Sequence, residues 1–189
     1  MKAQFLDSVE KYDGSQLVSL HNYLQHKLLG DSIVAWVGPC DVSIEHMVDG
    51  EDLLQNAEIR GSKMLHFLIE KFEVQLFSAV ALQRLLASIL KDQIATVATD
   101  KALAALMFRE GDDLYVGERK LSISIATQTP LSSLIHFAVN VSNVGTPVKT
   151  LSLEDLGIEP KILALESMTL FCNEVKSIRQ ATQKVRWAK

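Results

Sequence analysis

Residues 111–127, GDDLYVGERKLSISIAT, contain the pattern that decides the fold of this chain. Gly117 separates two short runs, so the stretch predicts two β-strands joined by a turn. Asp113 stands near the start of the first strand and Lys120 opens the second, and a hairpin of this length brings both side chains to one end of a sheet. A carboxylate and an ammonium held there suit the handling of an anionic ligand, such as a phosphate or a carboxylate. The alternative is a surface hairpin with solvated charges.

Runs of apolar residues predict further strands and helices on both sides of this hairpin. The predicted strands cover residues 32–37, 64–72 and 134–141, and the predicted helices cover residues 74–91 and 100–107. Near the N-terminus, Ser15 is suited to a helix N-cap, and leucines recur at helical spacing until Gly30. This pattern predicts a first helix between those two residues.

The C-terminal part of the chain predicts a long helix with one apolar face. The apolar residues at three-four spacing are Leu165, Met168, Cys172, Val175, Ile178 and Val185. We interpret this stripe as core packing rather than as a partner-binding surface.

The predicted strands outnumber the helical crossovers that a parallel sheet would need. The sequence therefore predicts an α+β fold with a mixed, mostly antiparallel sheet flanked by helices. A length of 189 residues fits one domain, covering residues 1–189 and ending in the long helix.

Composition and charge argue against several functions. The net charge is -4 and no dense basic stripe occurs, which argues against nucleic-acid binding. No stretch approaches the roughly 18 apolar residues of a membrane span. The two cysteines, Cys40 and Cys172, form no CxxC pair, and the first residues carry acids where a signal peptide needs an apolar run. We therefore expect a cytoplasmic protein without membrane contact.

Residues 40–62 form an acidic segment without a sustained period, which is typical of a mobile or functional loop. A short helix around residues 49–56 is compatible with its sequence. Arg60 and Lys63, where this segment ends, are the only nearby cations suited to phosphate binding.

Two histidines lie in predicted strands. His136 suits a satisfied core or pocket histidine as well as a general base, and His66 alternates with apolar neighbours that would face the same cleft. The histidines of this chain do not form a metal-ligand pair of recognised spacing.

The hairpin resembles the catalytic domain of the biotin and lipoate protein ligases. Those enzymes carry an Asn-Asp pair at the end of a strand, then a turn, then a lysine preceded by arginine or lysine. Here the same register runs from Asp112-Asp113 to Arg119-Lys120, with Asp112 in the place of asparagine.

The resemblance continues after the lysine. Ser122 and Ser124 are small residues, as in the lipoate ligases, and residues 133–141, SLIHFAVNV, are similar to the histidine-led strand of lipoate ligases and octanoyltransferases. With YDGSQL, GDSIVAWVGPCDV and KMLHFLIE, the whole chain resembles an uncharacterised family within this group, the domain-of-unknown-function family number three-six-six.

The resemblance implies roles for the residues of the hairpin. Lys120 would contact both the acyl carboxylate and the α-phosphate of ATP, because a fixed cation eases the meeting of two anions. Asp113 would contact magnesium or the nucleotide, and Asp112 would either favour a metal or weaken phosphate binding. His136 would line the same cleft as a catalytic residue, and Arg60 and Lys63 would contact the nucleotide.

The chain also departs from the ligases. It lacks their glycine- and arginine-rich loop, in whose place the acidic segment stands, and this puts adenylation in doubt. The octanoyltransferases use a cysteine after the histidine-led strand, where this chain reads SNVGTP. Cys172 is predicted to be a packing residue, and Cys40 could serve as a nucleophile only if the Gly38-Pro39 turn brought it to Lys120.

Two functions follow from these observations. The first is a ligase or acyltransferase that activates or transfers a small carboxylate or acyl ligand, with ATP and magnesium, a possible acceptor protein and a possible homodimer. The second is a non-catalytic module that keeps the fold and binds a small ligand or a protein.

Overall fold

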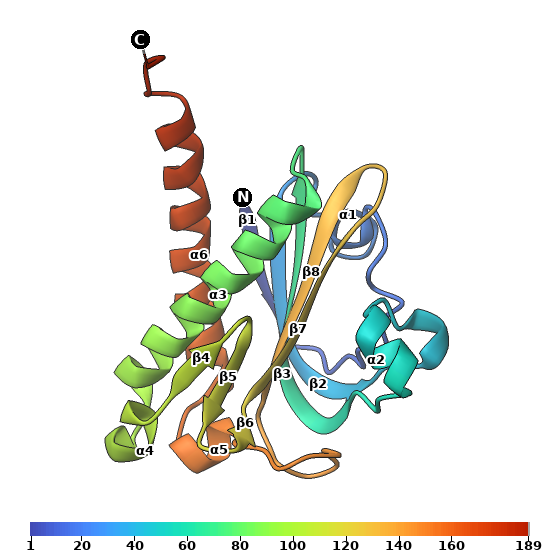
Figure 1. Ribbon diagram of the computed structural model, residues 1–189, viewed down its shortest axis with the longest axis vertical. Helices are drawn as coiled ribbons and strands as arrows, with labels where there is room; N and C mark the ends of the chain where they lie inside the picture. The colour runs from blue at the N-terminus through green and yellow to red at the C-terminus, as the bar shows by residue number, and fades with distance from the viewer. Residues whose placement is uncertain (189) are drawn as a thin grey trace.

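The computed structural model describes residues 1–188, and its centre is a five-stranded sheet (Figure 1). In spatial order the strands are β1 (Lys2–Leu6), β2 (Ser32–Asp41), β3 (Arg60–Phe72), β8 (Ser132–Asn140) and β7 (Ser122–Gln128). β1 and β2 are parallel, and each of the other neighbouring pairs is antiparallel. The predicted α+β fold with a mixed, mostly antiparallel sheet is therefore confirmed.

A small second sheet lies beside the end of the first one. It contains β4 (Phe108–Glu110), β5 (Asp113–Val116) and β6 (Arg119–Lys120), which are all antiparallel. The turn between β5 and β6 contains Gly117, whose φ of 57° lies in the left-handed region that glycine adopts without strain. The predicted hairpin is confirmed.

Two long helices cover one face of the large sheet (Figure 1). α3 (Leu76–Val97) packs on β7 and β8, and α6 (Pro160–Thr182) packs on β1 and β2. Two short helices, α4 (Lys101–Ala105) and α5 (Leu153–Leu156), lie at the same end as the small sheet. None of the helices within residues 1–188 has the length and apolar character needed to cross a membrane.

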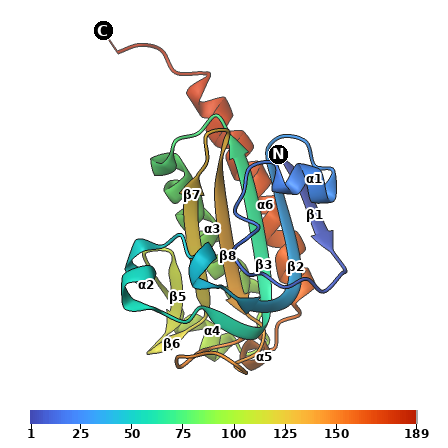
Figure 2. The same cartoon turned by 90° about the vertical axis from the view of Figure 1, so that its right-hand side faces the viewer.

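The opposite face carries short elements, namely α1 (His21–His26), a 3-10 turn (Ile44–His46) and α2 (Gly50–Gln55) (Figure 2). Side chains alternate along each strand, so the sheet has two separate apolar layers. On β8, Phe137 belongs to the layer under the long helices, whereas Leu134 and Ala138 belong to the layer on the opposite face. His136 lies between these two residues and therefore faces the side of α1 and α2.

The predicted first helix is wrong in its extent, because only α1 is helical. Asp13 accepts hydrogen bonds from the backbone and the hydroxyl of Ser15, so Ser15 closes a turn and does not cap a helix. The chain then passes through Leu20, whose φ is 66° and whose amide donates to the buried carboxylate of Glu70 at 2.6 Å. This tertiary hydrogen bond overrides the leucine spacing.

The acidic segment is shorter than predicted, because the strands on both sides extend into it. β2 continues through Pro39 to Asp41 with a register shift between Gly38 and Cys40, and β3 begins at Arg60. Proline has no amide hydrogen to donate, so it does not fit a regular ladder. Pro39 is tolerated here because the register shift interrupts the ladder at this position. The short helix expected in this segment is present as α2, with Asp49 as its N-cap.

The C-terminal helix is present, but its predicted apolar stripe is only partly buried. Met168 and Val175 pack in the core, whereas Leu165 and Ile178 are 45% exposed and Val185 lies beyond the end of α6. The helix extends past the sheet, so its last turns have no apolar surface to pack against (Figure 1).

Candidate functional site

The candidate site begins at the β5–β6 hairpin, where Lys120 and Asp113 meet. Tyr115 pairs with Lys120 across the hairpin, and Asp113 precedes Tyr115 on the same face of β5. The Nζ atom of Lys120 lies 2.7 Å from Oδ2 of Asp113, and their side chains are 29% and 23% exposed. The structure thus brings together the two charges that the sequence places on either side of Gly117.

Partial burial and the ion pair shift both pKa values. Burial acts to lower the pKa of Lys120, but the hydrogen bond and the charge of Asp113 outweigh it, so the pKa is raised above 10.5. Burial raises the pKa of Asp113, against the opposing effect of Lys120. Lys120 is therefore charged at neutral pH and can contact an anion.

A cavity of about 190 Å³ lies beside this ion pair and is here called the Lys120 chamber. Its polar lining residues include Asp52, Arg60, Lys120, Ser122 and Asn140. They come from α2 and from four different strands, so the chamber exists only in the folded chain.

Lys120 is fixed in this chamber through its backbone. The side-chain amide of Asn140, on β8, donates to the carbonyl of Lys120 at 3.1 Å and to the carbonyl of Leu151 at 3.2 Å. The amide of Lys120 donates to the carbonyl of Lys149 at 3.1 Å. The strand position from which the ammonium extends is therefore held from both sides.

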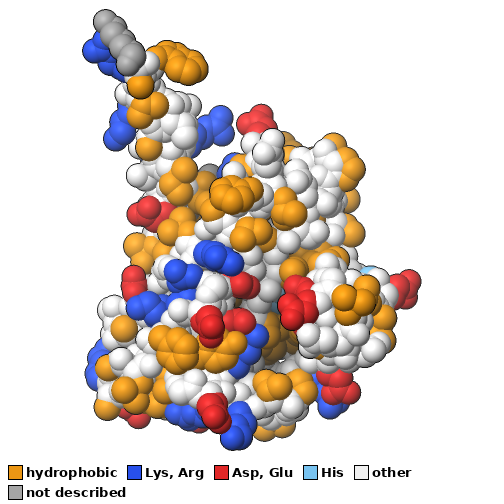
Figure 3. Space-filling model, in the orientation of Figure 1, with side chains coloured by type: hydrophobic (Ala, Val, Ile, Leu, Met, Phe, Trp, Pro, Cys, Tyr) orange, Lys and Arg blue, Asp and Glu red, His pale blue; other side chains and the backbone are white. Residues whose placement is uncertain are grey.

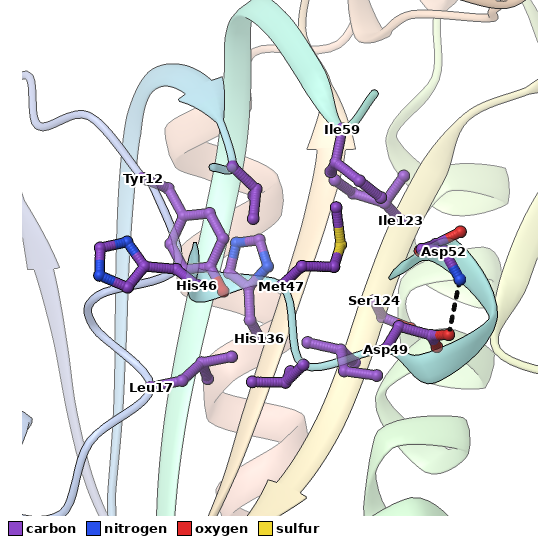
Figure 4. A pocket seen from close by; sticks show the side chains of 13 residues that line it. Tyr12, Leu17, His46, Met47, Asp49, Asp52, Ile59, Ile123, Ser124 and His136 are labelled. Carbon is purple, nitrogen blue, oxygen red and sulfur yellow. Dashed lines mark hydrogen bonds between the residues drawn. The ribbon is translucent and has the colours of Figure 1, made fainter. Parts of the chain in front are cut away.

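A second, mostly apolar cavity of about 50 Å³ is here called the His136 chamber (Figure 4). Its lining residues include Tyr12, Leu17, Met47, Ile125 and His136. The two chambers have Asp52, Ile59 and Ile123 in common, so they adjoin each other. We refer to them together as the cleft, which has one apolar end and one charged end.

His136, which lines the His136 chamber, forms a buried pair with His66. His66 Nδ1 lies 3.0 Å from His136 Nε2, and His66 Nε2 lies 3.1 Å from the carbonyl oxygen of Gly38. The Tyr12 ring stacks on His136 with centroids 3.4 Å apart, and Trp36 stacks on His66 at 5.0 Å. Both rings are thus held in place by aromatic neighbours.

Burial keeps both imidazoles neutral. Desolvation lowers the pKa of His66 to about 4, although the hydrogen bond to Gly38 opposes this shift. Desolvation, together with the neighbouring His66, lowers the pKa of His136 well below 6.5. At neutral pH His136 is therefore an uncharged hydrogen-bonding group.

The remaining predicted site residues lie in different surroundings. Asp112 accepts hydrogen bonds from Gln83 of α3 at 2.8 Å and from Ser124 at 2.6 Å, so it braces a wall residue of the His136 chamber. Arg60 lines the Lys120 chamber and pairs with Glu58 at 2.7 Å.

Lys63 is not among the residues that line the two chambers. Its ammonium lies 3.4 Å from Glu154, and more than half of both side chains is exposed. Of the two cations predicted to contact a nucleotide, the structure brings only Arg60 to the chamber of Lys120.

Neither cysteine has the surroundings of an activated nucleophile. Cys40 is buried beside Tyr12, and desolvation raises its pKa to about 12. Burial also raises the pKa of Cys172. A thiol whose thiolate is disfavoured is a poor nucleophile.

The cleft does not fit a magnesium site. Within residues 1–188, no group of three or more His, Cys, Asp or Glu side chains is placed to hold a metal ion. Asp113, the predicted metal contact, is instead engaged by Lys120. A single carboxylate that is already paired with an ammonium does not make the oxygen-ligand set that magnesium requires.

Tyr12, Asp52 and Asn140 are among the cleft residues that were not identified as site residues from the sequence. The sequence allows a short helix around residues 49–56, but it does not show that Asp52 of this helix lines the same chamber as Lys120. Burial raises the pKa of Asp52, whereas the nearby charge of Lys120 lowers it. In Figure 3, the acidic side chains of the α2 region and the acidic and basic side chains of the hairpin are visible on the same face of the molecule.

Comparison with known proteins gives a family and two close likenesses. Residues 1–186 match the model of a family described as a domain of unknown function, DUF366. An uncharacterized protein of Methanocaldococcus jannaschii is 30% identical over 180 residues, which cover 92% of this chain and 79% of that protein. A protein of unknown function from Pyrococcus horikoshi has a structure with a TM-score of 0.91 at 38% identity, covering 100% of this chain and 99% of that one.

More distant likenesses link the fold to ligases. Biotin protein ligase from Aquifex aeolicus, in complex with biotin and ATP, has a TM-score of 0.58 at 14% identity, covering 95% of this chain and 72% of that one. A P. falciparum protein in complex with lipoate has a TM-score of 0.53 at 12% identity, covering 92% and 63%. Identities this low show the fold alone, and the predicted ligase-like fold is confirmed.

Proposed function

We propose, for a chain that belongs to the DUF366 family as its sequence predicted, that the cleft binds a small amphipathic carboxylate or acyl compound. The apolar part of this ligand occupies the His136 chamber, and its carboxylate contacts Lys120. The observation that carries the proposal is that an apolar chamber adjoins a chamber with a fixed ammonium. Ile59 and Ile123 line both chambers.

The physical argument concerns the two ends of the cleft. Apolar side chains favour an alkyl group, because burial removes its surface from water. Lys120 already pairs with Asp113 at 2.7 Å, so a ligand carboxylate would join an existing charged pair and share the ammonium. Arg60 supplies a second cation on the same chamber.

Calorimetry with straight-chain carboxylates, from butanoate to decanoate, tests this proposal. Each acid is compared with the alcohol of the same chain length, and the acids are expected to bind more tightly. Because a hydrogen bond to a charged group contributes about 1.5–3 kcal/mol, Lys120→Ala is expected to weaken binding about 10- to 100-fold. Lys63→Ala is the matched control, since Lys63 does not line either chamber, and it is expected to bind as the parent does.

Equal affinities for acids and alcohols would contradict the proposal. So would carboxylate binding that survives in Lys120→Ala. Circular dichroism of each variant establishes that the fold is unchanged before affinities are compared.

A second candidate function is activation of the bound acid with ATP. One observation favours it, the likeness of the fold to a ligase solved with biotin and ATP. The acidic α2 and the lack of a metal-binding group within residues 1–188 weigh against it. Release of pyrophosphate from ATP in the presence of a carboxylate, lost in Lys120→Ala, would establish this function, and the absence of both ATP binding and pyrophosphate release would exclude it.

An acyl-transferring enzyme would need further partners. An acceptor protein that receives the acyl group and a homodimer were predicted with the ligase function, and both belong to this second candidate. Sedimentation equilibrium measures the oligomeric state directly, and transfer of a labelled acid to proteins of a cell extract tests for an acceptor.

A further inference from the structure

The buried histidine pair has only one arrangement of protons that satisfies its hydrogen bonds. The carbonyl oxygen of Gly38 can only accept, so the Nε2 of His66, 3.1 Å away, carries a proton. A neutral His66 then has a lone pair on Nδ1. The Nε2 of His136, 3.0 Å from that lone pair, must donate to it.

The consequence for His136 follows directly. With its single proton on Nε2, the ring presents a lone pair on Nδ1. His136 is 2% exposed and lines the apolar chamber. In the part of the chain that the structure describes, no side chain donates to this nitrogen.

The position of the ring is fixed as firmly as its tautomer. Tyr12 lies parallel to His136 within 6°, and its centroid is 3.4 Å away. Among residues 1–188, the sealed polar side-chain atoms without a partner are Asn22 Oδ1 and Ser167 Oγ, and the Nδ1 of His136 is not one of them. This nitrogen is therefore not sealed inside the protein, and the cavity that the His136 ring lines is the His136 chamber (Figure 4).

We infer that His136 is a specificity-determining residue, whose Nδ1 lone pair selects ligands with an N–H or O–H donor at the end buried in the apolar chamber. This inference rests on the proposed function and names its ligand class more closely, as a carboxylate whose distal end carries a hydroxyl or an amine-type donor. An apolar wall cannot distinguish such a ligand from a plain alkyl acid, whereas a buried acceptor left without a donor disfavours the plain acid.

The tautomer is tested first, without any ligand. Long-range proton–nitrogen correlation spectra of the ¹⁵N-labelled protein give the protonation of each ring nitrogen. At neutral pH, His136 is expected to show an unprotonated Nδ1 and a protonated Nε2, and His66 is expected to show the same tautomer. A protonated Nδ1 on His136 would overturn the inference.

Ligand selection is tested with matched pairs of carboxylates. Acids from butanoate to decanoate are compared with the same acids carrying a terminal hydroxyl, and the hydroxyl member of the best pair is expected to bind at least ~10-fold more tightly. His136→Gln keeps an amide donor for His66 and an acceptor for the ligand, so it retains the preference. His136→Leu removes the acceptor and abolishes the preference.

A third probe separates this inference from the proposed function. Hexan-1-ol and 1-methoxypentane have similar size and no carboxylate, and only the alcohol can donate. If the alcohol alone moves the Nδ1 resonance of His136 while no carboxylate binds, the inference stands and the proposed function fails. If carboxylates bind through Lys120 but hydroxyl and methyl members bind equally, the proposed function stands and the inference fails. If neither alcohol nor carboxylate binds, both fail.

Discussion

Asn140 holds the backbone of Lys120 by donating its side-chain amide to the lysine carbonyl at 3.1 Å, across the boundary between the two sheets. The same amide nitrogen donates to the carbonyl of Leu151. One buried side chain on β8 therefore ties together the hairpin that carries the ammonium and the segment that follows β8.

Asn140→Asp tests this arrangement with almost no change in shape. An ionised aspartate cannot donate, so it would place a negative oxygen opposite two carbonyl oxygens. We expect the free energy of unfolding in urea to fall by about 2–4 kcal/mol, because two acceptors lose their donor and a charge is buried. Carboxylate affinity should fall as well, because the position of Lys120 is no longer fixed.

Asn173→Asp on α6 is the matched control. Among the described residues, the Asn173 side chain makes no hydrogen bond to the rest of the protein. The free energy of unfolding of this variant should therefore stay within about 0.5 kcal/mol of the parent. If Asn140→Asp were as stable as this control, the proposed hold on Lys120 would be wrong.

The buried histidines should make the protein less stable in acid. The pKa of His66 is lowered to about 4, so between pH 6.5 and 4 the unfolded chain binds a proton that the folded protein does not. Stability is therefore complete above pH 6.5 and decreases as the pH falls towards 4. His66 alone is expected to account for about 3 kcal/mol of this loss, and His136 adds to it in the same direction.

Urea unfolding at several pH values measures this effect. His66→Phe removes this buried imidazole and should flatten the dependence on pH. A parent protein whose unfolding free energy does not change over this range would contradict the neutral, buried state of His66.

Gly38 leaves no room for a side chain. A Cβ atom at this position would lie 1.9 Å from the carbonyl oxygen of Glu10, which itself accepts a hydrogen bond from Trp36. Gly38→Ala is therefore expected to lower the melting temperature strongly, with a loss of about 2–4 kcal/mol, and to disturb the anchor of His66.

Gly50→Ala provides the comparison for this substitution. Nothing lies within 4 Å of a Cβ at Gly50, which is the first residue of α2. Alanine should therefore leave stability unchanged or raise it by up to about 1 kcal/mol. Similar losses from both substitutions would show that the close approach at Gly38 is not the cause.

Lys27 occupies a conformation better suited to glycine. It caps the C-terminus of α1 with a φ of 61° and is exposed. Lys27→Gly should stabilise the protein by about 0.5–1 kcal/mol, because glycine adopts the left-handed region without strain. Lys91→Gly, within α3, should have the opposite effect by about 1 kcal/mol. Thermal unfolding of the two variants gives the signs directly, and equal signs would contradict the assignment of strain to Lys27.

The parts of the fold that were predicted correctly depend on local pattern. The β5–β6 hairpin follows from the turn at Gly117 and the strands beside it, whereas the sequence marked α2 only as a short helix compatible with residues 49–56. The N-terminal helix was predicted too long, because the leucine spacing does not show that the amide of Leu20 bonds to Glu70 in a distant strand. Local preference yields to such a tertiary contact.

The candidate site, too, was predicted from the sequence only in part. Lys120 and Asp113 were found because one turn brings them together, within a few residues of sequence. The pairing of His66 with His136 joins positions 70 residues apart, and the contact of Tyr12 with His136 joins residues that are farther apart still in the sequence. Neither can be derived from spacing, because both depend on strand order and register.

The irregular step in β2 has a consequence for how this protein can vary. Pro39 interrupts the ladder next to the carbonyl that anchors His66. A chain that regained regular pairing here would offer that oxygen a backbone partner and would compete with the imidazole for it. The irregular step thus keeps the Gly38 oxygen available to His66 and so maintains the tautomers of both histidines, on which the inferred ligand selection depends.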